Sequence, residues 1–381
     1  MRLTTAAQPS RAHASGAAAS ARGIEQPQAR DRSPASVSGG KERLQVWQAL
    51  LSVRSLVLSM SEDAETWMKF ASLCRKSGRV RQSKKTLVQL LKYDPETITA
   101  ADVPGYGGGS GQPYAMFAFL KHMWATGASV DAYDRLQDLS KELVANRSHL
   151  APPAAGDAHK PPLLSRVYLK LGLWKWALIQ SKMDDENVST ILSNLKVATE
   201  LARSWAKAWH NWAYFNVAAL DFYQAKDDNA TAVRHVAPAV LGFFRSIALG
   251  QATANRRGNS VNLQDILRLL TLWFNHGYHP DVRAALEEGF GHVSIDTWLV
   301  VIPQIIARVH SSSIPVRELI QQLLIRIGRH HPQALMYPLL VATKSSSTGR
   351  RAAACAAARG PARSASSRSP WRGRSGRPRR S

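Results

Sequence analysis

Three closely spaced tryptophans constrain the fold of this chain more than any other feature. Trp205, Trp209 and Trp212 are four and three residues apart in the stretch RSWAKAWHNWA, which places them on one face of an α-helix. Each large aromatic side chain can bury roughly 150–250 Å², so such a stripe needs a partner surface. The spacing predicts a packed core helix, with Lys207 and His210 off the stripe and able to face water. An aromatic cage for a ligand is disfavoured, because rings in one row do not face one another.

Helical periodicity recurs along most of the chain. Apolar residues return every three to four positions between short breaks rich in Gly, Pro or Ser, and no stretch alternates convincingly with a period of two. We therefore expect an all-α fold, an α-solenoid of stacked antiparallel helix pairs. Asp63 is the expected N-cap of the second helix. The predicted helices cover residues 44–58, 63–76, 79–92, 114–125, 130–146, 163–171, 174–183, 188–200, 203–226, 232–249, 263–275, 281–289, 295–308, 316–328 and 332–343.

One helix pair has the spacing of a tetratricopeptide repeat. From Trp67 the chain places Ala71 four residues on, Gly78 eleven, Ser83 sixteen and Pro95 twenty-eight. The repeat has a Trp, small residues where its helices cross, and a Pro after its second helix at similar offsets. Small residues matter because antiparallel helices approach closely only where side chains are short. The pattern predicts a helix hairpin, and only weakly a peptide-binding repeat.

The formal net charge of +23 is concentrated at the two ends of the chain. Residues 1–40 contribute +3 and residues 344–381 contribute +11, so the part between them is only mildly basic and nucleic acid is not its expected partner. We expect disorder in 1–40, a helical-repeat domain over 44–345, and a disordered Arg-, Ser- and Ala-rich tail over 346–381. The N-terminal segment also fits a transit peptide. The tail also fits an RNA-binding arginine segment, or GC-rich DNA translated out of frame.

Cysteine content and hydropathy indicate a cytoplasmic chain. Cys74 and Cys355 are too few for a disulfide framework or a four-cysteine zinc site, which fits a reducing compartment. The N-terminus lacks an apolar signal-peptide core, and no stretch reaches the ~20 apolar residues of a membrane helix. We expect no membrane span.

Motif searches favour a chain without catalytic or metal-binding residues. The glycine-rich stretch 104–113 lacks the GK[ST] ending of a P-loop, so it is predicted to be a linker. His276 with His279, and His330 with His331, lack a third ligand at a usable spacing and are predicted to be surface or turn residues. Nucleophile-elbow, HExxH, EF-hand, DFG and HRD-type motifs are absent from the sequence.

Several long stretches of this sequence carry a family resemblance. They are VRSLVLS (53–59), ED (62–63), TWMKFASLCRKSGR (66–79), KTLVQLL (85–91), ATELARSWAKAWHNWA (198–213), GFFRSIAL (242–249), LQDILRLLTLWFNHGYHPDV (263–282), and the run from IDTW to ATKS (295–345). In this order they resemble the FAT domain of the target-of-rapamycin (TOR) kinases. The resemblance covers roughly residues 44–345 and is specific, because the stretches are long and in order.

The resemblance implies a scaffold and not a catalyst. In that family the FAT domain is a helical-repeat clamp around a Ser/Thr kinase of the phosphatidylinositol-3-kinase-related class, and it helps to assemble the TOR complexes. The expected partners are therefore a TOR-type kinase domain and TOR-complex subunits, while ATP and Mg²⁺ belong to the kinase domain, whose motifs this sequence lacks. A free-standing tetratricopeptide-like adaptor for peptide or RNA is the alternative. It would need several hairpins like that at Trp67, and one good one is found.

The resemblance also implies a basic channel for an inositol polyphosphate such as inositol hexakisphosphate. The basic residues at matching motif positions are Arg54, Lys76, Arg79 and Lys85. A highly phosphorylated ring needs several convergent cations, which Arg and Lys supply. Four basic residues on neighbouring helices also fit a simple solvated face.

Overall fold

A computed structural model describes residues 34–97, 112–146, 160–179, 182–257 and 263–343. Within these ranges every regular element is a helix, which confirms the predicted all-α class. The elements are α1 (Pro34–Arg54), α2 (Ala64–Lys76), α3 (Val80–Leu91), α4 (Gln112–Thr126), α5 (Ser129–Ala145), α6 (Leu163–Ile179), α7 (Asp185–Leu201), α8 (Ala206–Ala225), α9 (Asn229–Arg234), α10 (Val236–Arg257), α11 (Leu263–His276), α12 (Pro280–His292), the 3₁₀ helix η4 (Ile295–Val301), α13 (Ile302–Ile306), α14 (Ile314–His330) and α15 (Pro332–Thr343).

The chain divides into two compact units. Unit 1 comprises Met1–Leu269 and Ala284–His292, and unit 2 comprises Leu270–Arg283 and Val293–Ser381. Helices α11 and α12 therefore each contribute residues to both units.

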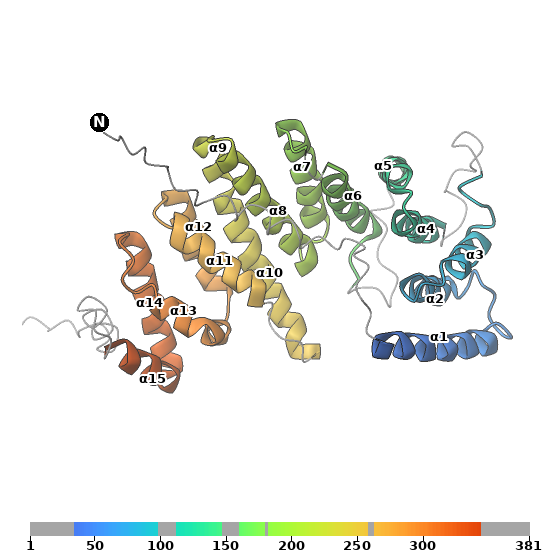
Figure 1. The fold of residues 1–381 in the computed structure, drawn as a ribbon. Coiled ribbons are helices and arrows are strands. Elements are labelled where there is room, and N and C mark those ends of the chain that lie inside the picture. The colour runs from blue at the N-terminus through green and yellow to red at the C-terminus, as the bar shows by residue number, and fades with distance from the viewer. Residues whose placement is uncertain (1–33, 98–111, 147–159, 180–181, 258–262, 344–381) are drawn as a thin grey trace, which may run out of the picture. The chain divides into compact units, whose positions relative to one another are not determined.

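Unit 1 is a stack of helix pairs in chain order. Contacts join α2 with α3, α4 with α5 and α6 with α7, and further contacts join α3 with α4, α5 with α6 and α7 with α8. Helix α8 then packs along α10, and the short α9 contacts both. Helices α2 to α10 follow one another in Figure 1. Because each helix packs mainly on its sequence neighbours, this is the predicted α-solenoid arrangement.

The hairpin of α2 and α3 follows the pattern counted from Trp67. Gly78 lies in the turn with φ of +86°, a left-handed conformation that glycine adopts without steric cost. Ala71 and Ser83 are buried, as small residues at a helix crossing should be. Asp63 is the N-cap residue of α2, as predicted, but its side chain makes no capping hydrogen bond to the helix backbone. Its carboxylate instead accepts hydrogen bonds from Nε and Nη2 of Arg54, at 2.7 and 2.9 Å.

The tryptophan stripe is less buried than its spacing predicts. Helix α8 begins at Ala206, Trp205 is its N-cap residue, and all three tryptophans are only half-buried. The reason is a close helix crossing, since a Cβ added at Gly242 of α10 would lie 2.8 Å from the Cβ of Ala213 in α8. Small residues occupy the contact, so the indole rings lie beside it. The rings of Trp209 and Trp212 meet edge to face, with centroids 5.8 Å apart.

His210 reaches water only in part, since 28% of its side chain is exposed. Its Nδ1 lies 2.8 Å from Oδ1 of Asp265, which is fully buried. Oγ of Ser246 donates a hydrogen bond of 2.9 Å to the other carboxylate oxygen of Asp265. This polar cluster joins α8, α10 and the first turn of α11.

Two predicted helices are interrupted. The helix expected over 232–249 is divided between α9 and α10 at His235. The helix expected over 295–308 begins as the 3₁₀ helix η4 and continues as α13. Pro303 lies in the first turn of α13, where its missing N–H is tolerated, and this favours a new helix start at that point.

Unit 2 has its own core around two tryptophans. The side chains of Trp273 and Trp298 are 0% and 1% exposed. Helix α14 contacts α15 and η4, and α13 contacts α15 and η4.

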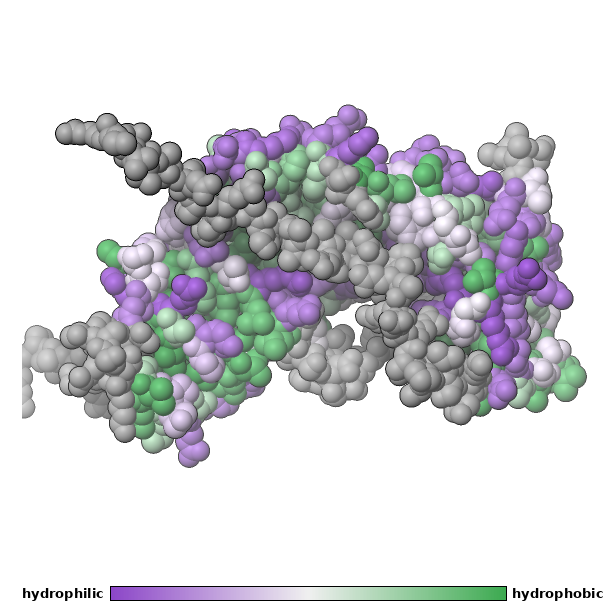
Figure 2. Space-filling view, in the orientation of Figure 1, coloured by the Kyte–Doolittle hydropathy of each residue, from purple (hydrophilic) through white to green (hydrophobic). Residues whose placement is uncertain are grey.

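Figure 2 shows hydrophobic side chains interspersed with hydrophilic ones on the visible face of the molecule. The exposed large hydrophobic residues in unit 2 are Tyr278, Val300, Ile314, Met336, Tyr337, Leu340 and Val341.

One helical segment has the length and composition of a membrane span, which the sequence analysis did not anticipate. It covers Asn229–Gln251 with a mean hydropathy of 1.2, and half of it is buried inside the protein. Phe243, Phe244 and Ile247 of this segment belong to the core of unit 1. Burial of this kind is what a core helix of an α-solenoid requires, so the segment is weak evidence for a membrane span.

Some predictions concern residues that the structure leaves undescribed. The glycine-rich linker over 104–111, the segment 1–33 and the tail from residue 344 lie outside the described ranges. Helix α1 begins at Pro34, within the segment 1–40 for which disorder was expected. Proline is favoured in the first turn of a helix, which explains the start.

Candidate anion-binding cavity

Unit 1 contains a cavity of about 570 Å³ between α2, α3, α4 and the start of α6. The two hairpins that enclose it turn at Gly78 and Gly127, whose positive φ angles keep the connections short. Small residues on α2 and α3 leave space between the helices. The lining consists of Ser61, Glu62, Ala64, Glu65, Met68, Lys69, Ala71, Ser72, Arg75, Ser83, Leu87, Tyr114, Ala118, Lys121, Lys160, Pro161 and Arg166.

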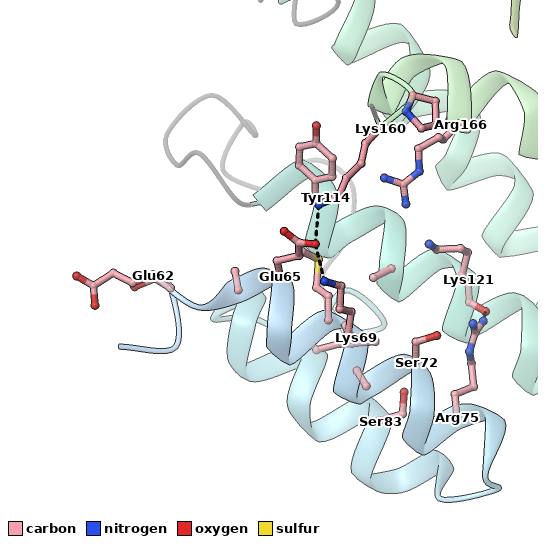
Figure 3. Close-up of a pocket in the computed structure, with 17 residues that line it drawn as sticks. Glu62, Glu65, Lys69, Ser72, Arg75, Ser83, Tyr114, Lys121, Lys160 and Arg166 are labelled. Carbon is pink, nitrogen blue, oxygen red and sulfur yellow. Dashed lines mark hydrogen bonds and ion pairs between the residues drawn. The ribbon is translucent and has the colours of Figure 1, made fainter. Parts of the chain in front are cut away.

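Positive charge dominates this lining. Five basic side chains line the cavity, namely Lys69, Arg75, Lys121, Lys160 and Arg166, against the two acids Glu62 and Glu65. In Figure 3 Glu62 points away from the other labelled side chains, whereas the amine of Lys121 and the guanidinium of Arg166 project into the same space.

Glu65 neutralises part of the charge at one end of the cavity. Its Oε1 accepts from Nζ of Lys160 at 2.7 Å and lies 2.8 Å from Nζ of Lys69. Hydrogen bonds from Lys160 and Lys69 lower the pKa of the Glu65 carboxyl to about 2. Figure 3 shows these two interactions as dashed lines. The carboxylate is therefore ionised at neutral pH and is shared by two cations.

Lys121 is the central cation at the other end. Its Nζ lies 4.2 Å from the centroid of the Phe117 ring, and the guanidinium of Arg166 lies 5.5 Å from the same centroid. Burial is the main reason that the pKa of the Lys121 ammonium falls to about 7, and the charges of Arg166, Arg75 and other nearby cations add to the effect. Among the described residues Lys121 has no ion pair with an acid.

Arg75 is held in place by the backbone of α4. Its Nη1 donates a hydrogen bond to the carbonyl oxygen of Lys121. This bond ties α2 to α4 beside the cavity and fixes a guanidinium next to the Lys121 backbone. The indole ring of Trp124, one turn beyond Lys121 on α4, stacks on that of Trp174, about two turns beyond Arg166 on α6, with centroids 4.5 Å apart. This ring contact joins the two helices that carry Lys121 and Arg166.

The charge of this lining favours an anionic ligand. Like charges that are partly withdrawn from water repel one another more than they would in bulk solvent, because the lower local dielectric screens them less. A multiply charged anion would relieve this repulsion and accept several charge-assisted hydrogen bonds. The cavity volume suits a small polyanionic molecule.

The four basic residues suggested by the sequence lie elsewhere. Arg54 is engaged by Asp63, and Lys76, Arg79 and Lys85 are exposed. None of the four is among the residues that line the cavity. Lys76 still influences the cavity, because its charge contributes to the lowered pKa of Lys121.

Sequence reasoning missed Lys121 and Arg166, although each left a signal. Lys121 interrupts the apolar run AMFAFL of α4, and Arg166 lies in the equally apolar start of α6. A lone cation in a helix that is otherwise apolar on all sides must find an anion or remain buried at a cost. Lys160 lies shortly before α6 and follows a segment without helical periodicity. The sequence therefore could not predict where its side chain lies.

Two family models match this chain. The FAT domain model matches residues 30–271, and the model for HEAT repeats of ATR-like Ser/Thr protein kinases matches residues 281–364. The first match covers more than half of the chain and includes every helix that lines the cavity.

Relatives and solved structures agree with these matches. The chain is 51% identical over 325 residues to the Ser/Thr protein kinase TOR of Arabidopsis thaliana, covering 84% of this chain and 13% of the relative. It is 36% identical over 368 residues to the Ser/Thr protein kinase TOR2 of Saccharomyces cerevisiae, covering 83% and 14%. A solved CtTel1 dimer has a similar fold, with a TM-score of 0.57 at 14% identity over 85% of this chain and 13% of that one. The chain thus spans only a small part of the proteins it matches.

Proposed function

This chain belongs to the FAT domain family, and we propose that it acts as the non-catalytic scaffold segment of a TOR-type Ser/Thr protein kinase. In this proposal it clamps a kinase domain, supports assembly of TOR complexes, and works in the cytoplasm. The observation that carries the proposal is the FAT domain match over residues 30–271, which coincides with an ordered stack of helix pairs. Helix pairs of this kind present long, continuous surfaces to a partner.

Co-purification tests the scaffold role. The full chain would be expressed with the kinase domain of a TOR relative, and an unrelated helical-repeat protein would serve as the control. We expect the chain and the kinase domain to elute together in equal amounts, and the control to elute separately. Separate elution of the chain and the kinase domain would contradict the clamp.

The cavity in unit 1 supports a second part of the proposal, that the scaffold holds an inositol polyphosphate. Inositol hexakisphosphate is the reference ligand, because its phosphates surround a compact ring and need convergent cations. Lys121 and Arg166 would bind it at the inner end, where Phe117 positions both side chains. Lys160 and Lys69 would meet its outer phosphates, which would compete with Glu65 for the two lysines.

Arg75 has a different role in this arrangement. Its hydrogen bond to the Lys121 carbonyl leaves it as a positioning residue that also adds positive potential. Arginine suits such a place, because one guanidinium donates to several acceptors at once. The surface residues Lys76, Arg79 and Lys85 contribute only to the long-range field that attracts an anion.

Isothermal titration of inositol hexakisphosphate into the full chain tests the ligand. We expect Lys121→Met and Arg166→Met each to weaken binding about ten-fold or more, because a charge-assisted hydrogen bond contributes roughly 1.5–3 kcal/mol. Lys76→Met and Lys85→Met are matched controls on the surface and should change binding much less. Loss of binding in the surface variants with full binding in the cavity variants would move the site to the α2–α3 surface. Circular dichroism melting would establish that each variant is folded.

A further inference from the structure

Among the residues that the structure describes, no acid forms an ion pair with the amine of Lys121 in the cavity. On its own helix, Tyr114 and His122 are the other titratable groups, and Nδ1 of His122 lies 3.1 Å from Oγ of Ser83 on α3, so that ring is engaged away from the amine. Burial lowers the pKa of His122, which keeps this ring neutral near neutral pH.

The helices packed around Lys121 present cations to it. Helix α2 provides Arg75 and Lys76, and α6 provides Arg166 and Lys170, all of which act on the Lys121 charge in the same direction. Helix α3 adds the uncharged side chains of Ser83 and Leu87 to the cavity wall, and no described residue of α5 lines it. The nearest acid in the lining, Glu65, is already shared by Lys69 and Lys160.

Two charge states of Lys121 therefore compete. In the empty cavity two effects disfavour a proton on Nζ of Lys121. Burial disfavours the charged form, and the nearby cations repel it. A bound phosphate reverses the balance, since an adjacent anion favours the charged ammonium. The Phe117 ring at 4.2 Å further favours a cation once the cavity charge is neutralised.

From this geometry we propose that Lys121 couples occupancy of the cavity to proton uptake, so that a polyphosphate binds together with one proton and is held less tightly as the pH rises. The inference rests on the proposed ligand and concerns the regulation of the same site. It makes the scaffold sensitive to intracellular pH through a single side chain.

Calorimetry in buffers of different ionisation enthalpy measures the protons taken up on binding. Inositol hexakisphosphate is the probe, and the protein is the full chain. Lys121→Arg is the decisive variant, because arginine keeps the positive charge and remains protonated throughout. Lys141→Arg is the control, since Lys141 is exposed, pairs with Asp138 and lies outside the cavity lining.

The wild type and Lys141→Arg should take up about three quarters of a proton more than Lys121→Arg at about pH 7.5, because a Lys121 ammonium with a pKa of about 7 is mostly deprotonated there before binding. Their affinity should also fall roughly ten-fold relative to Lys121→Arg between about pH 7 and pH 8.5. The phosphates of the ligand titrate in the same way with both proteins. The difference in proton uptake between the wild type and Lys121→Arg therefore reports Lys121 itself.

Two results would overturn the inference, and they are distinguishable. Tight binding with equal proton uptake in the wild type and Lys121→Arg would refute the coupling while leaving the ligand in place. No binding by the wild type at any pH would remove the ligand proposal and this inference with it.

Discussion

Gly289 of α12 lies directly against the ring of Phe244 in α10. A Cβ added at Gly289 would come within 2.1 Å of Cδ2 of that ring, closer than two non-bonded carbon atoms can approach. The two helices therefore meet where only a hydrogen atom fits. Phe244 is almost completely buried and packs edge to face with Phe290, so its ring has little room to move.

Gly289→Ala should destabilise unit 1. Forcing a methyl group into a packed contact costs about 1–3 kcal/mol. Gly291→Ala on the same helix is the matched control, because nothing lies within 4 Å of its added Cβ. Alanine there should stabilise the helix by up to about 1 kcal/mol. Urea denaturation of both variants measures the difference, and equal stabilities would show that the helices are not in contact at Gly289.

The core of unit 2 should depend on Trp273 and Trp298. Both side chains are essentially fully buried, so Trp273→Ala or Trp298→Ala should lower the free energy of unfolding by about 3–5 kcal/mol. Tyr337→Ala removes another large ring from a site that is 76% exposed and should change stability little. Thermal melting compares the three variants. Melting of the tryptophan variants at the wild-type temperature would place the core elsewhere.

Replacing Lys121 should stabilise the empty protein. The pKa of Lys121 is about 7 in the folded chain, whereas in the unfolded chain it lies near the ordinary lysine value of 10.5. The unfolded chain thus binds more protons between these values, and stability rises with pH across that window. Lys121→Met removes the penalty, so its gain in Tm should be largest at or below about pH 7 and shrink toward about pH 10.

A pH series of melting curves measures this gain. Lys141→Met is the control and should show no such trend, since Lys141 is exposed. A gain that grows with pH would mean that Lys121 is charged and paired in the folded state.

Glu65 should restrain ligand affinity. It draws Lys160 and Lys69 into ion pairs of 2.7 and 2.8 Å, which a polyphosphate must share or break. Glu65→Gln removes that negative charge, so inositol hexakisphosphate should bind about three- to ten-fold more tightly at low salt, and the gain should shrink at high salt. Titration at two salt concentrations tests this. Weaker binding by the variant would show that Glu65 is needed to position the two lysines.

The sequence predicted the fold well where local signals agree. The spacing from Trp67 predicted the hairpin of α2 and α3. Small residues at the helix crossing and a glycine in the turn both favour two closely packed antiparallel helices. The burial predicted for the tryptophans of α8 was too high. A helical stripe indicates which residues share a face, but it does not indicate which face the neighbouring helix covers. The contact of Ala213 with Gly242 decided that, and it joins residues far apart in the chain.

The candidate site could be predicted only in its chemistry. A requirement for several cations followed from the resemblance, but the residues chosen were those within the best motifs. Lys121 and Arg166 lie on helices separated by α5 and meet through the Phe117 ring, a relationship that no sequence spacing contains. Arg54 shows the same limit, because its ion pair with Asp63, the N-cap residue of α2, could not be predicted from the sequence.

A crystal structure of the full chain grown with inositol hexakisphosphate tests the central claim most directly. The account predicts density for the ligand inside unit 1, with phosphates against Nζ of Lys121 and the guanidinium of Arg166. Density on the outer surface at Lys76, Arg79 and Lys85, or an empty cavity at saturating ligand, would contradict it.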